Sequence, residues 1–410
     1  MTTQLIKKSL LSVLSIMLIS TAVIAQERFV ATTGDDTAND CSSSGTPCLT
    51  VQHAIDQASA SDEISVAAGT YRENLLITKS LTLTGSNAGV AGTGTRGTET
   101  IIQPGSTNLV SGIVVTVAAS SVAINGFTIS GDNDVITGAS SFDALTGVYF
   151  NATAAALTGF DFQNNIVRDF PRDNTSGATN AIDGFGVIPS AGVIIQGSDM
   201  GTSGHTVRNN WFRDIDDEPN DDYADNLGFG LVLLDSAYAD ISDNRFTDVG
   251  GGLAVSDVPK ASATDSLVVE RLYMSRSKVG IIANGGSINF TADSVTIVNP
   301  VAFGVRLVKA DDDDTDFYLK YSSITGAGSS IADKSDLLTN YSGFAAEKYS
   351  GAGTQTVRID SCVISDNRNR GITFRGNVAD ATNVGAINFS TLEGNAYDGQ
   401  AGNAYTVIVN

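Results

Sequence analysis

A six-residue pattern that recurs along the chain constrains its fold more than any other feature. Every copy ends on an apolar residue, and nearly all begin on one. The copies are INGFTI (124–129), FQNNIV (162–167), VRNNWF (207–212), ISDNRF (241–246), VERLYM (269–274), ADSVTI (292–297), LKYSSI (319–324), IDSCVI (359–364) and INFSTL (387–392). A glycine followed by alternating apolar residues usually comes next, as in GLVL (230–233) and GIIA (280–283). In the compact repeats this glycine lies six or seven positions after the pattern ends, which indicates one structural unit used many times.

The spacing of these repeats predicts a solenoid. The distance from one start to the next falls to 23, 27 and 28 residues in the shortest repeats and reaches 45 in the longest. The 42 glycines suit short strands joined by tight turns, and no long helical period follows residue 60. A unit this short cannot bury its own apolar residues, so each turn has to stack on its neighbours. We therefore expect an all-β solenoid rather than a sandwich.

The N-terminal segment 29–85 resembles the opening of parallel β-helix proteins of the pectin-lyase-like superfamily. It begins FVATTGDD, contains VAAGTY (66–71) and ends on SLTLTG (80–85). Between them, the segment from Thr50 to Ala60 places Val51, Ala54, Ile55 and Ala58 on one face of a short helix. Such a helix can cover the open end of a solenoid and its strand edges. The resemblance implies a right-handed, single-stranded parallel β-helix with a short N-terminal capping helix.

The chain is expected to form one domain after a removable leader. Residues 1–25 have the basic start and apolar stretch of a signal peptide, and Gln26 rather than Cys follows the expected cut. Residues 26–410 form the β-helix domain, with the cap and first coils in 26–85 and the repeat coils in 86–410. Long loops are expected within the repeat coils at 130–146, 168–191, 213–229 and 325–342.

The leader and the charge predict a secreted or cell-surface protein with no membrane insertion after cleavage. Loss of Lys7 and Lys8 with a leader that holds no acidic residue takes the formal charge from −21 to −23. A surface this acidic repels nucleic acid and anionic lipid. Cys41 and Cys48, with six residues between them in a Ser/Gly-rich loop, are expected to form a disulfide, although two free thiols are the alternative.

Within the pattern, positions one, four and six should face inward, and positions two and five outward. Position four is Asn165, Asn210 and Asn244 in three successive repeats. Stacked amides can satisfy one another where water has no access, so these residues are interpreted as a structural asparagine ladder. Cys362 occupies the same position and is expected to be a packed, inert thiol.

Position five points to a carbohydrate site, because it is Trp211, Arg245 and Tyr273 in neighbouring repeats. Two aromatic faces with a guanidinium between them would offer sugar rings both apolar contact and hydrogen bonds. The alternative is that the two aromatic residues pack under a long loop.

An acidic run between 214 and 225 raises the question of a metal. Its candidate ligands for Ca²⁺ are Asp214, Asp216, Asp217, Asp221, Asp222 and Asp225. The run lacks the spacing of an EF-hand. The alternatives are a solvated loop and the wall of a binding cleft that touches substrate without metal. No cofactor is required by any motif.

The sequence carries none of the catalytic signatures of the superfamily's pectin-degrading enzymes. The leading hypothesis is therefore a protein that binds extracellular polysaccharide or cell-surface glycan, or acts as an adhesin, without catalysis. The first alternative is a polysaccharide lyase or glycoside hydrolase acting on the loop-lined face. Lyase chemistry would draw on Arg168, Arg213, Arg245 and Tyr273 to bind a carboxylate and remove a proton. The second alternative is a structural module of a larger surface protein.

Overall fold

The computed structural model describes most of the chain from residue 25 onward. The described residues are 25–105, 112–136, 144–170, 190–197, 202–215, 228–235, 237–256, 267–285, 289–309, 314–328, 341–348, 353–368, 370–376, 382–388, 390–393, 395, 397–401 and 405–409. The expected signal peptide lies outside them except for its last residue, and its cleavage stays a prediction.

Within these residues the strands form three parallel sheets, which we call A, B and C. Sheet A contains β1 (Glu27–Val30), β2 (Glu63–Val66), β5 (Thr82–Thr84), β8 (Ala123–Asn125), β11 (Asp161–Gln163), β14 (Thr202–Arg208), β17 (Ala237–Ser242), β20 (Leu267–Glu270), β23 (Asn289–Asp293), β26 (Thr315–Lys320), β29 (Thr354–Asp360), β32 (Thr382–Asn388) and β35 (Tyr405–Val409). Sheet B contains β3 (Gly69–Arg72), β6 (Thr100–Gln103), β9 (Thr128–Ser130), β12 (Ile166–Phe170), β15 (Trp211–Ile215), β18 (Arg245–Val249), β21 (Tyr273–Ser275), β24 (Thr296–Val298), β27 (Ser323–Thr325), β30 (Val363–Ser365) and β33 (Thr391–Glu393). Sheet C contains β4 (Leu75–Ile77), β7 (Ile113–Val117), β10 (Thr146–Asn151), β13 (Ala191–Gln196), β16 (Phe229–Leu234), β19 (Gly251–Ser256), β22 (Val279–Asn284), β25 (Phe303–Lys309), β28 (Ser342–Lys348), β31 (Arg370–Gly376) and β34 (Tyr397–Ala401).

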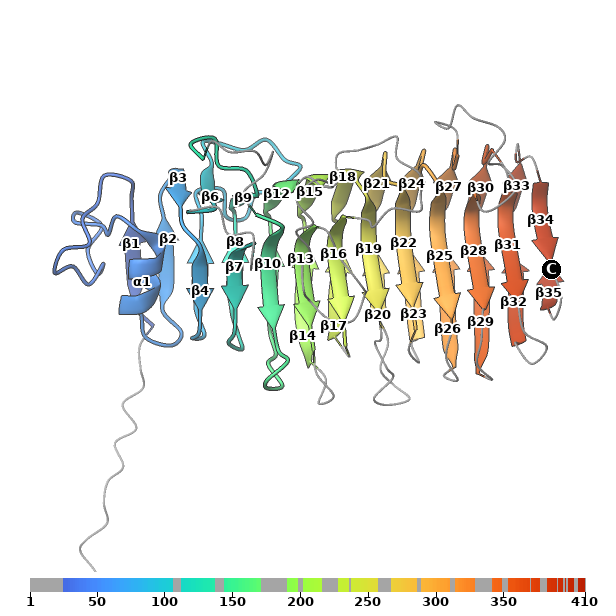
Figure 1. The fold of residues 1–410 in the computed structure, drawn as a ribbon, viewed down its shortest axis with the longest axis horizontal. Coiled ribbons are helices and arrows are strands. Elements are labelled where there is room, and N and C mark those ends of the chain that lie inside the picture. The colour runs from blue at the N-terminus through green and yellow to red at the C-terminus, as the bar shows by residue number, and fades with distance from the viewer. Residues whose placement is uncertain are drawn as a thin grey trace, which may run out of the picture.

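One strand from each sheet makes one coil. From β2 onward, each strand pairs in parallel with the strand three elements further along the chain. Trp211, for example, lies between Ile166 of the preceding coil and Arg245 of the next. The coils follow one another along the long axis, from the blue N-terminal end to the red C-terminal end (Figure 1). The expected all-β parallel β-helix is confirmed.

The six-residue pattern is the corner between sheets A and B. In VRNNWF, Val207 and Arg208 end β14, Asn209 turns the chain with a φ of 58°, and Trp211 begins β15. The third position of the pattern has positive φ in eight copies: Gly126, Asn164, Asn209, Asp243, Arg271, Ser294, Tyr321 and Ser361. The expected inward positions are buried in this copy, since Val207, Asn210 and Phe212 are each 0% exposed.

The strands of sheet B extend further than the pattern indicated. β12 and β15 end at Phe170 and Ile215, three residues beyond the pattern, because these two apolar side chains face the interior and are 0% exposed. The loops expected at 168–191 and 213–229 therefore begin later than predicted. The ranges 130–146 and 325–342 likewise include residues of the flanking strands.

The glycine that follows each pattern is explained by close packing between sheets C and B. A Cβ atom on Gly192 would lie 2.6 Å from the carbonyl oxygen of Gly230 and 3.0 Å from the ring of Phe212. On Gly252 it would lie 2.7 Å from the sulfur of Met274. Only glycine avoids these contacts, so the residue recurs at this place in successive coils from Gly147 of β10 to Gly371 of β31. The apolar core it borders is continuous from Val30 to Ile387.

The stacked asparagines fill the inside of the A–B corner. Asn210 Oδ1 accepts the backbone N–H of Asn165 at 2.9 Å, and Asn244 Oδ1 accepts the N–H of Asn210 at 3.0 Å. Asn210 Nδ2 also donates to the carbonyl oxygen of Phe162 at 2.9 Å. These buried backbone groups thus have side-chain partners from the neighbouring coil. Cys362 occupies the same column further along, is 2% exposed, and burial raises the pKa of its thiol.

A second pair of stacked asparagines, which the sequence pattern did not reveal, lies at the far end of sheet B. The backbone N–H and the Nδ2 of Asn367 both donate to Asn395 Oδ1, at 3.0 and 2.8 Å. The pattern missed this pair because the six-residue frame ends before the corner where these residues lie.

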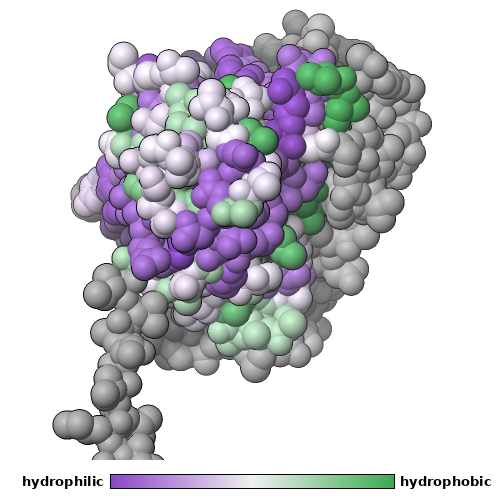
Figure 2. Space-filling view, turned by 90° about the vertical axis from the view of Figure 1, so that its left-hand side faces the viewer, coloured by the Kyte–Doolittle hydropathy of each residue, from purple (hydrophilic) through white to green (hydrophobic). Residues whose placement is uncertain are grey.

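A short helix lies at the N-terminal end of the solenoid. α1 (Val51–Gln57) begins after Thr50, whose side chain accepts the N–H of His53, and it ends at Ala58, which is extended. The helix is therefore shorter than the expected span of 50–60, but Val51, Ala54, Ile55 and Ala58 are buried as its predicted face requires. Seen from this end, the surface is mainly hydrophilic with scattered apolar residues, so the core is covered (Figure 2).

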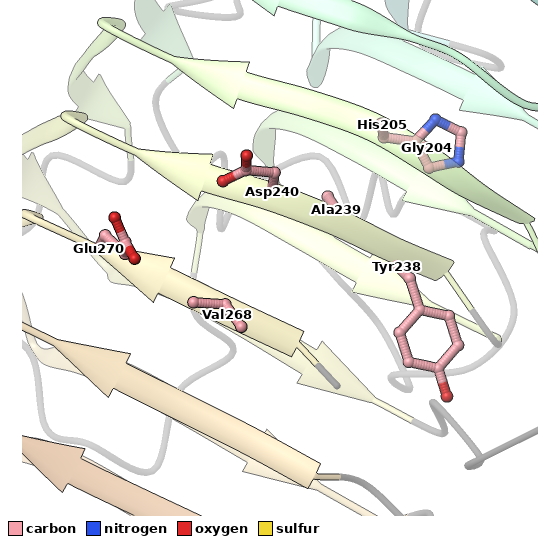
Figure 3. A pocket seen from close by; sticks show the side chains of 7 residues that line it. All are labelled: Gly204, His205, Tyr238, Ala239, Asp240, Val268 and Glu270. Carbon is pink, nitrogen blue, oxygen red and sulfur yellow. The ribbon is translucent and has the colours of Figure 1, made fainter. Parts of the chain in front are cut away.

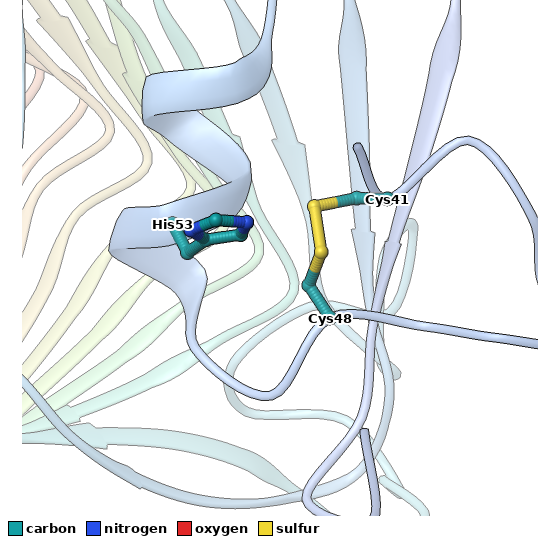
Figure 4. A group of neighbouring side chains, drawn as sticks. All are labelled: Cys41, Cys48 and His53. Carbon is teal, nitrogen blue, oxygen red and sulfur yellow. A yellow bond between two sulfur atoms is a disulfide. The ribbon is translucent and has the colours of Figure 1, made fainter. Parts of the chain in front are cut away.

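The loop before this helix holds a disulfide between Cys41 and Cys48. His53 lies beside it (Figure 4). The Nε2 of His53 lies 2.8 Å from the carbonyl oxygen of Asn39. These three side chains are the one metal-type cluster among the described residues, but the two sulfurs are bonded to each other, so the cluster does not suit a metal ion. In the described part of the chain, no helix is long and apolar enough to span a membrane.

Candidate carbohydrate-binding and catalytic face

Trp211, Arg245 and Tyr273 lie side by side on the outer face of sheet B. They are partners in the register of β15, β18 and β21, one coil apart each. The guanidinium of Arg245 lies 4.8 Å from the ring centre of Tyr273 and 5.9 Å from that of Trp211. Arg245 and Tyr273 are exposed, whereas Trp211 is half-buried. The three residues thus form a strip, which we call the aromatic strip, in which Arg245 lies over both rings and the side chains of Arg245 and Tyr273 reach solvent.

The indole of Trp211 is held in place by its neighbours. Its Nε1–H donates to the hydroxyl of Thr247 at 2.8 Å, from the coil that carries Arg245. The guanidinium of Arg213 lies 4.9 Å from the centre of the ring. A hydrogen bond and a cation–π contact fix the ring before any ligand arrives, which lowers the entropy lost on binding.

A row of three aspartates runs beside the aromatic strip. Asp169, Asp214 and Asp248 occupy the same place in successive coils, with φ values of 62°, 55° and 56°. Left-handed backbone favours Asp, Asn or Gly, which explains the residue type at this corner. Burial raises the pKa of Asp214; Arg213 lowers it, and the carboxylates of Asp169 and Asp248 raise it further.

Arginines pair with each carboxylate of this row. Arg168 Nη1 lies 2.6 Å from Asp169, Arg213 Nη1 lies 3.1 Å from Asp214, and Arg276 pairs with Asp248. The Nε of Arg213 is buried without a hydrogen-bond partner among the described residues. Each aspartate of the row is therefore part of an ion pair.

The residues proposed for lyase chemistry are brought together but are already engaged. Arg168 and Arg213 are paired with aspartates, and Arg245 lies between two aromatic rings. Tyr273 forms the end of the aromatic strip rather than facing a carboxylate-binding cluster.

The calcium prediction is only partly within the described residues. Asp214 lies in β15, whereas Asp216, Asp217, Asp221, Asp222 and Asp225 lie outside the described part of the chain. Asp214, Asp169 and Asp248 do not gather closely enough to form a metal cluster among the described residues. Calcium binding stays a prediction.

Sequence reasoning missed several residues of this face. Thr247, Asp169, Asp248 and Arg276 follow the pattern by one or two positions, and the pattern was read as ending in a loop there. The recurrence of Asp two residues after the pattern in three successive repeats was the signal that could have found the aspartate row.

A separate depression lies between β14, β17 and β20 on sheet A. It has a volume of about 430 Å³ and is lined by Gly204, His205, Tyr238, Ala239, Asp240, Val268 and Glu270 (Figure 3). Of its charged side chains, Glu270 is paired with Arg271.

Comparison with known proteins identifies the fold. No protein-family model matches the sequence, and a search of curated proteins finds no match. Among solved structures, the catalytic domain of a GH87 α-1,3-glucanase in complex with tetrasaccharides is similar, with a TM-score of 0.52 and 12% identity, over 88% of this chain and 66% of that chain. The A-module of an Azotobacter vinelandii mannuronan C-5 epimerase is similar over 87% of this chain and 94% of that module, with 16% identity and a TM-score of 0.45.

The chain thus has a right-handed parallel β-helix fold similar to that of the glucanase domain. It spans slightly less than two thirds of the glucanase domain. At such low identities the similarity concerns the fold, and function has to be argued from the site.

Proposed function

We propose that this protein is a glycoside hydrolase that acts on a neutral extracellular polysaccharide at the outer face of sheet B. The observation that carries the proposal is the row of Asp169, Asp214 and Asp248 directly beside the aromatic strip. Sugar-binding side chains and paired carboxylates are the two requirements of glycoside hydrolysis.

The aromatic strip supports binding of a sugar chain along the solenoid axis. Successive coils are about 4.8 Å apart, so the three side chains present a nearly continuous platform. Trp211 and Tyr273 offer the apolar surface of their rings that Arg245 leaves uncovered to the C–H side of sugar rings, and Arg245 donates hydrogen bonds to hydroxyl groups.

The two carboxylates nearest the open part of the strip fit the two catalytic roles. Asp214, whose pKa is raised, donates its proton to the glycosidic oxygen as the bond breaks. Asp248, one coil away and oriented by Arg276, attacks the anomeric carbon; water then releases the sugar as Asp214 takes back a proton. A backbone spacing of about 4.8 Å suits the carboxylate separation of about 5–5.5 Å in retaining enzymes.

A neutral substrate fits this face better than a uronate. β-Elimination needs cations to neutralise the substrate carboxylate, but Arg168 and Arg213 are paired with aspartates. The formal charge of −21 also opposes an anionic polymer. The glucanase of similar fold was solved with tetrasaccharides, which supports an enzymatic role over the adhesive one.

The site of action is proposed to be outside the cell. The leader sequence and the Cys41–Cys48 disulfide both suit an exported protein. Mass spectrometry of the protein recovered from culture medium should find a mature N-terminus at Gln26, and an intact leader on all secreted protein would contradict export by cleavage.

Activity is tested on a panel of neutral glucans of different linkage, with alginate and polygalacturonate as uronate polymers. The expected result is release of reducing sugar from a neutral glucan without growth of absorbance near 235 nm. Absorbance growth on a uronate would demonstrate a lyase instead, and saturable binding without any turnover would favour the non-catalytic protein.

Variants assign the roles. Asp214→Asn and Asp248→Asn should each lower turnover by about 10²–10⁴-fold, the usual contribution of such a group. Asp366→Asn is the matched control, because Asp366 has the same left-handed backbone at the same corner of a distant coil, with a φ of 55°. Equal losses in all three variants would refute the assignment. NMR should show retention of the anomeric configuration.

A further inference from the structure

The outer face of sheet B is blocked on one side of the aromatic strip. On β9, the outward side chains of Thr128 and Ser130 are 2% and 1% exposed, whereas Arg245 and Tyr273 are exposed three and four coils further on. The contrast is between equivalent positions for Thr128, which is in register with Arg245 and Tyr273 through the strands between them, whereas Ser130 is in register with Thr247 and Ser275, which are also buried. Some part of the chain therefore covers β9 and leaves β18 and β21 open.

One part of this cover is the segment 85–99, between β5 and β6. Its backbone reaches three coils forward, from the coil of β5 to that of β14, since the N–H of Gly92 donates to the carbonyl oxygen of Asn209 at 2.8 Å. A Cβ on Gly92 would lie 2.8 Å from the backbone nitrogen of Trp211, so the segment packs directly against the start of β15.

Arg96 and Glu99 hold this segment over β9. Arg96 Nη1 donates to the carbonyl oxygen of Asn164 at 2.6 Å, and its side chain is only 5% exposed. Arg96 pairs with both oxygens of Glu99 at 2.8 and 2.9 Å, and the hydroxyl of Thr128 donates to Glu99 at 3.1 Å. Because these hydrogen bonds of Arg96 and Glu99 are largely shielded from solvent, they hold the segment 85–99 in place over β9.

The second part of the cover comes from the opposite edge of β9. The Nδ2 of Asn133 donates to the carbonyl oxygen of Pro104 at 2.7 Å, and Arg72 donates to Asn133 Oδ1 at 3.1 Å. The hydroxyl of Ser130 donates to Asp169 at 3.0 Å. The two parts together form a barrier across the sheet, which we call the β9 barrier.

We propose that the β9 barrier makes this face a chain-end site: the polysaccharide lies over Tyr273, Arg245 and Trp211 and has to end before β9. A sugar chain that continued along the axis would meet the buried Arg96–Glu99 network. This inference rests on the proposed function and specifies its mode: short sugars are released from one end of the polymer.

The first test measures binding separately from hydrolysis. Asp214→Asn is titrated calorimetrically with short-chain and long-chain fractions of the same neutral glucan at equal mass. A chain-end site predicts that the number of protein molecules bound scales with the number of chains, and binding that scales with total mass overturns the inference. If binding scales with the number of chains but the wild type cleaves no glucan, the proposed hydrolysis is wrong and the chain-end site is retained. If no glucan binds, both proposals are wrong.

The second test follows the products of the active protein. Early products should be short sugars of a single length, and the viscosity of the polymer solution should fall slowly. Products of many lengths with a fast fall in viscosity would show hydrolysis at internal bonds and overturn the chain-end site. Arg96→Ala, which loosens the barrier, should raise the share of internal cuts several-fold. Arg271→Ala is the control, because Arg271 is also paired with two acidic residues but lies away from the barrier.

Because Arg96→Ala could unfold the segment, Glu99→Gln provides a milder change. It keeps a hydrogen-bonding side chain of the same length but removes the charge that pairs with Arg96. Its share of internal cuts should lie between those of the wild type and Arg96→Ala. An unchanged product pattern in both variants, with folding intact by circular dichroism, would contradict the role of the barrier.

Discussion

Replacement of Asn210 by alanine is expected to be among the most destabilising single changes in the solenoid. The side chain of Asn210 satisfies the N–H of Asn165 and the carbonyl oxygen of Phe162, and it donates a third hydrogen bond to Asn244 at 3.0 Å. Asn210 is 0% exposed, so water does not replace these partners without opening the corner.

The magnitude follows from the groups left without partners. Two buried backbone groups lose their hydrogen bonds, and each unsatisfied group costs about 1–3 kcal/mol. The free energy of unfolding should therefore fall by about 4 kcal/mol in Asn210→Ala. Asn210→Leu restores the lost volume but not the hydrogen bonds, so it should remain destabilised by a similar amount.

Urea unfolding followed by circular dichroism measures these changes. Gln163→Ala is the control, because Gln163 is an outward, partly exposed residue of a neighbouring coil, and its loss should cost less than about 0.5 kcal/mol. A loss in Asn210→Ala no larger than that of the control, or wild-type stability of Asn210→Leu, would show that the side-chain hydrogen bonds of Asn210 do not stabilise the corner.

Three further changes test other parts of the structure. Burial lowers the pKa of His205 from 6.5 to about 4, so the unfolded chain binds the extra proton first. The contribution of His205 should be complete above pH 6.5, fall by about 3 kcal/mol as the pH drops from 6.5 to about 4, and level off below that. His205→Gln should flatten this part of the stability curve, and a variant with the same pH profile as the wild type would contradict the assignment. Replacing Cys41 and Cys48 by serine should destabilise the cap by about 2 kcal/mol, since the closed loop is short. Proteolysis of the N-terminal segment should then be faster than in the wild type, and an unchanged rate would contradict this role of the disulfide. Thr247→Val removes the hydrogen bond to Trp211 and should weaken glycan binding about fivefold at unchanged melting temperature, whereas unchanged affinity would show that the indole is held by other contacts.

The coil architecture could be predicted from the sequence because the fold repeats. In each coil the inward positions of the pattern meet the same neighbours, so Asn165, Asn210 and Asn244 show the same residue type where one structural need recurs. The glycine column has the same origin, since the close approach at Gly192 is repeated at Gly252. The same packing or hydrogen-bonding requirement in each coil therefore gives the same residue type at each repeat of the sequence.

The candidate site could be predicted only in part, because its residues do not repeat. Trp211, Arg245 and Tyr273 were found through their shared outward position, but the aspartate row lies beyond the pattern. The β9 barrier depends on contacts such as that between Arg96 and Asn164, 68 residues apart, which no periodicity encodes. Such contacts follow from the paths of single loops over the solenoid.

Fluorescence of Trp211 tests the central claim, that sugar binds over the aromatic strip, because the chain contains one tryptophan. Titration of Asp214→Asn with oligosaccharides of the neutral glucan that the wild type cleaves should shift the emission to shorter wavelength in a saturable way. Arg245→Ala introduced into the same background should weaken the titration at least tenfold. Saturable binding by calorimetry with no change in Trp211 emission would place the sugar elsewhere on the molecule and contradict binding over the aromatic strip.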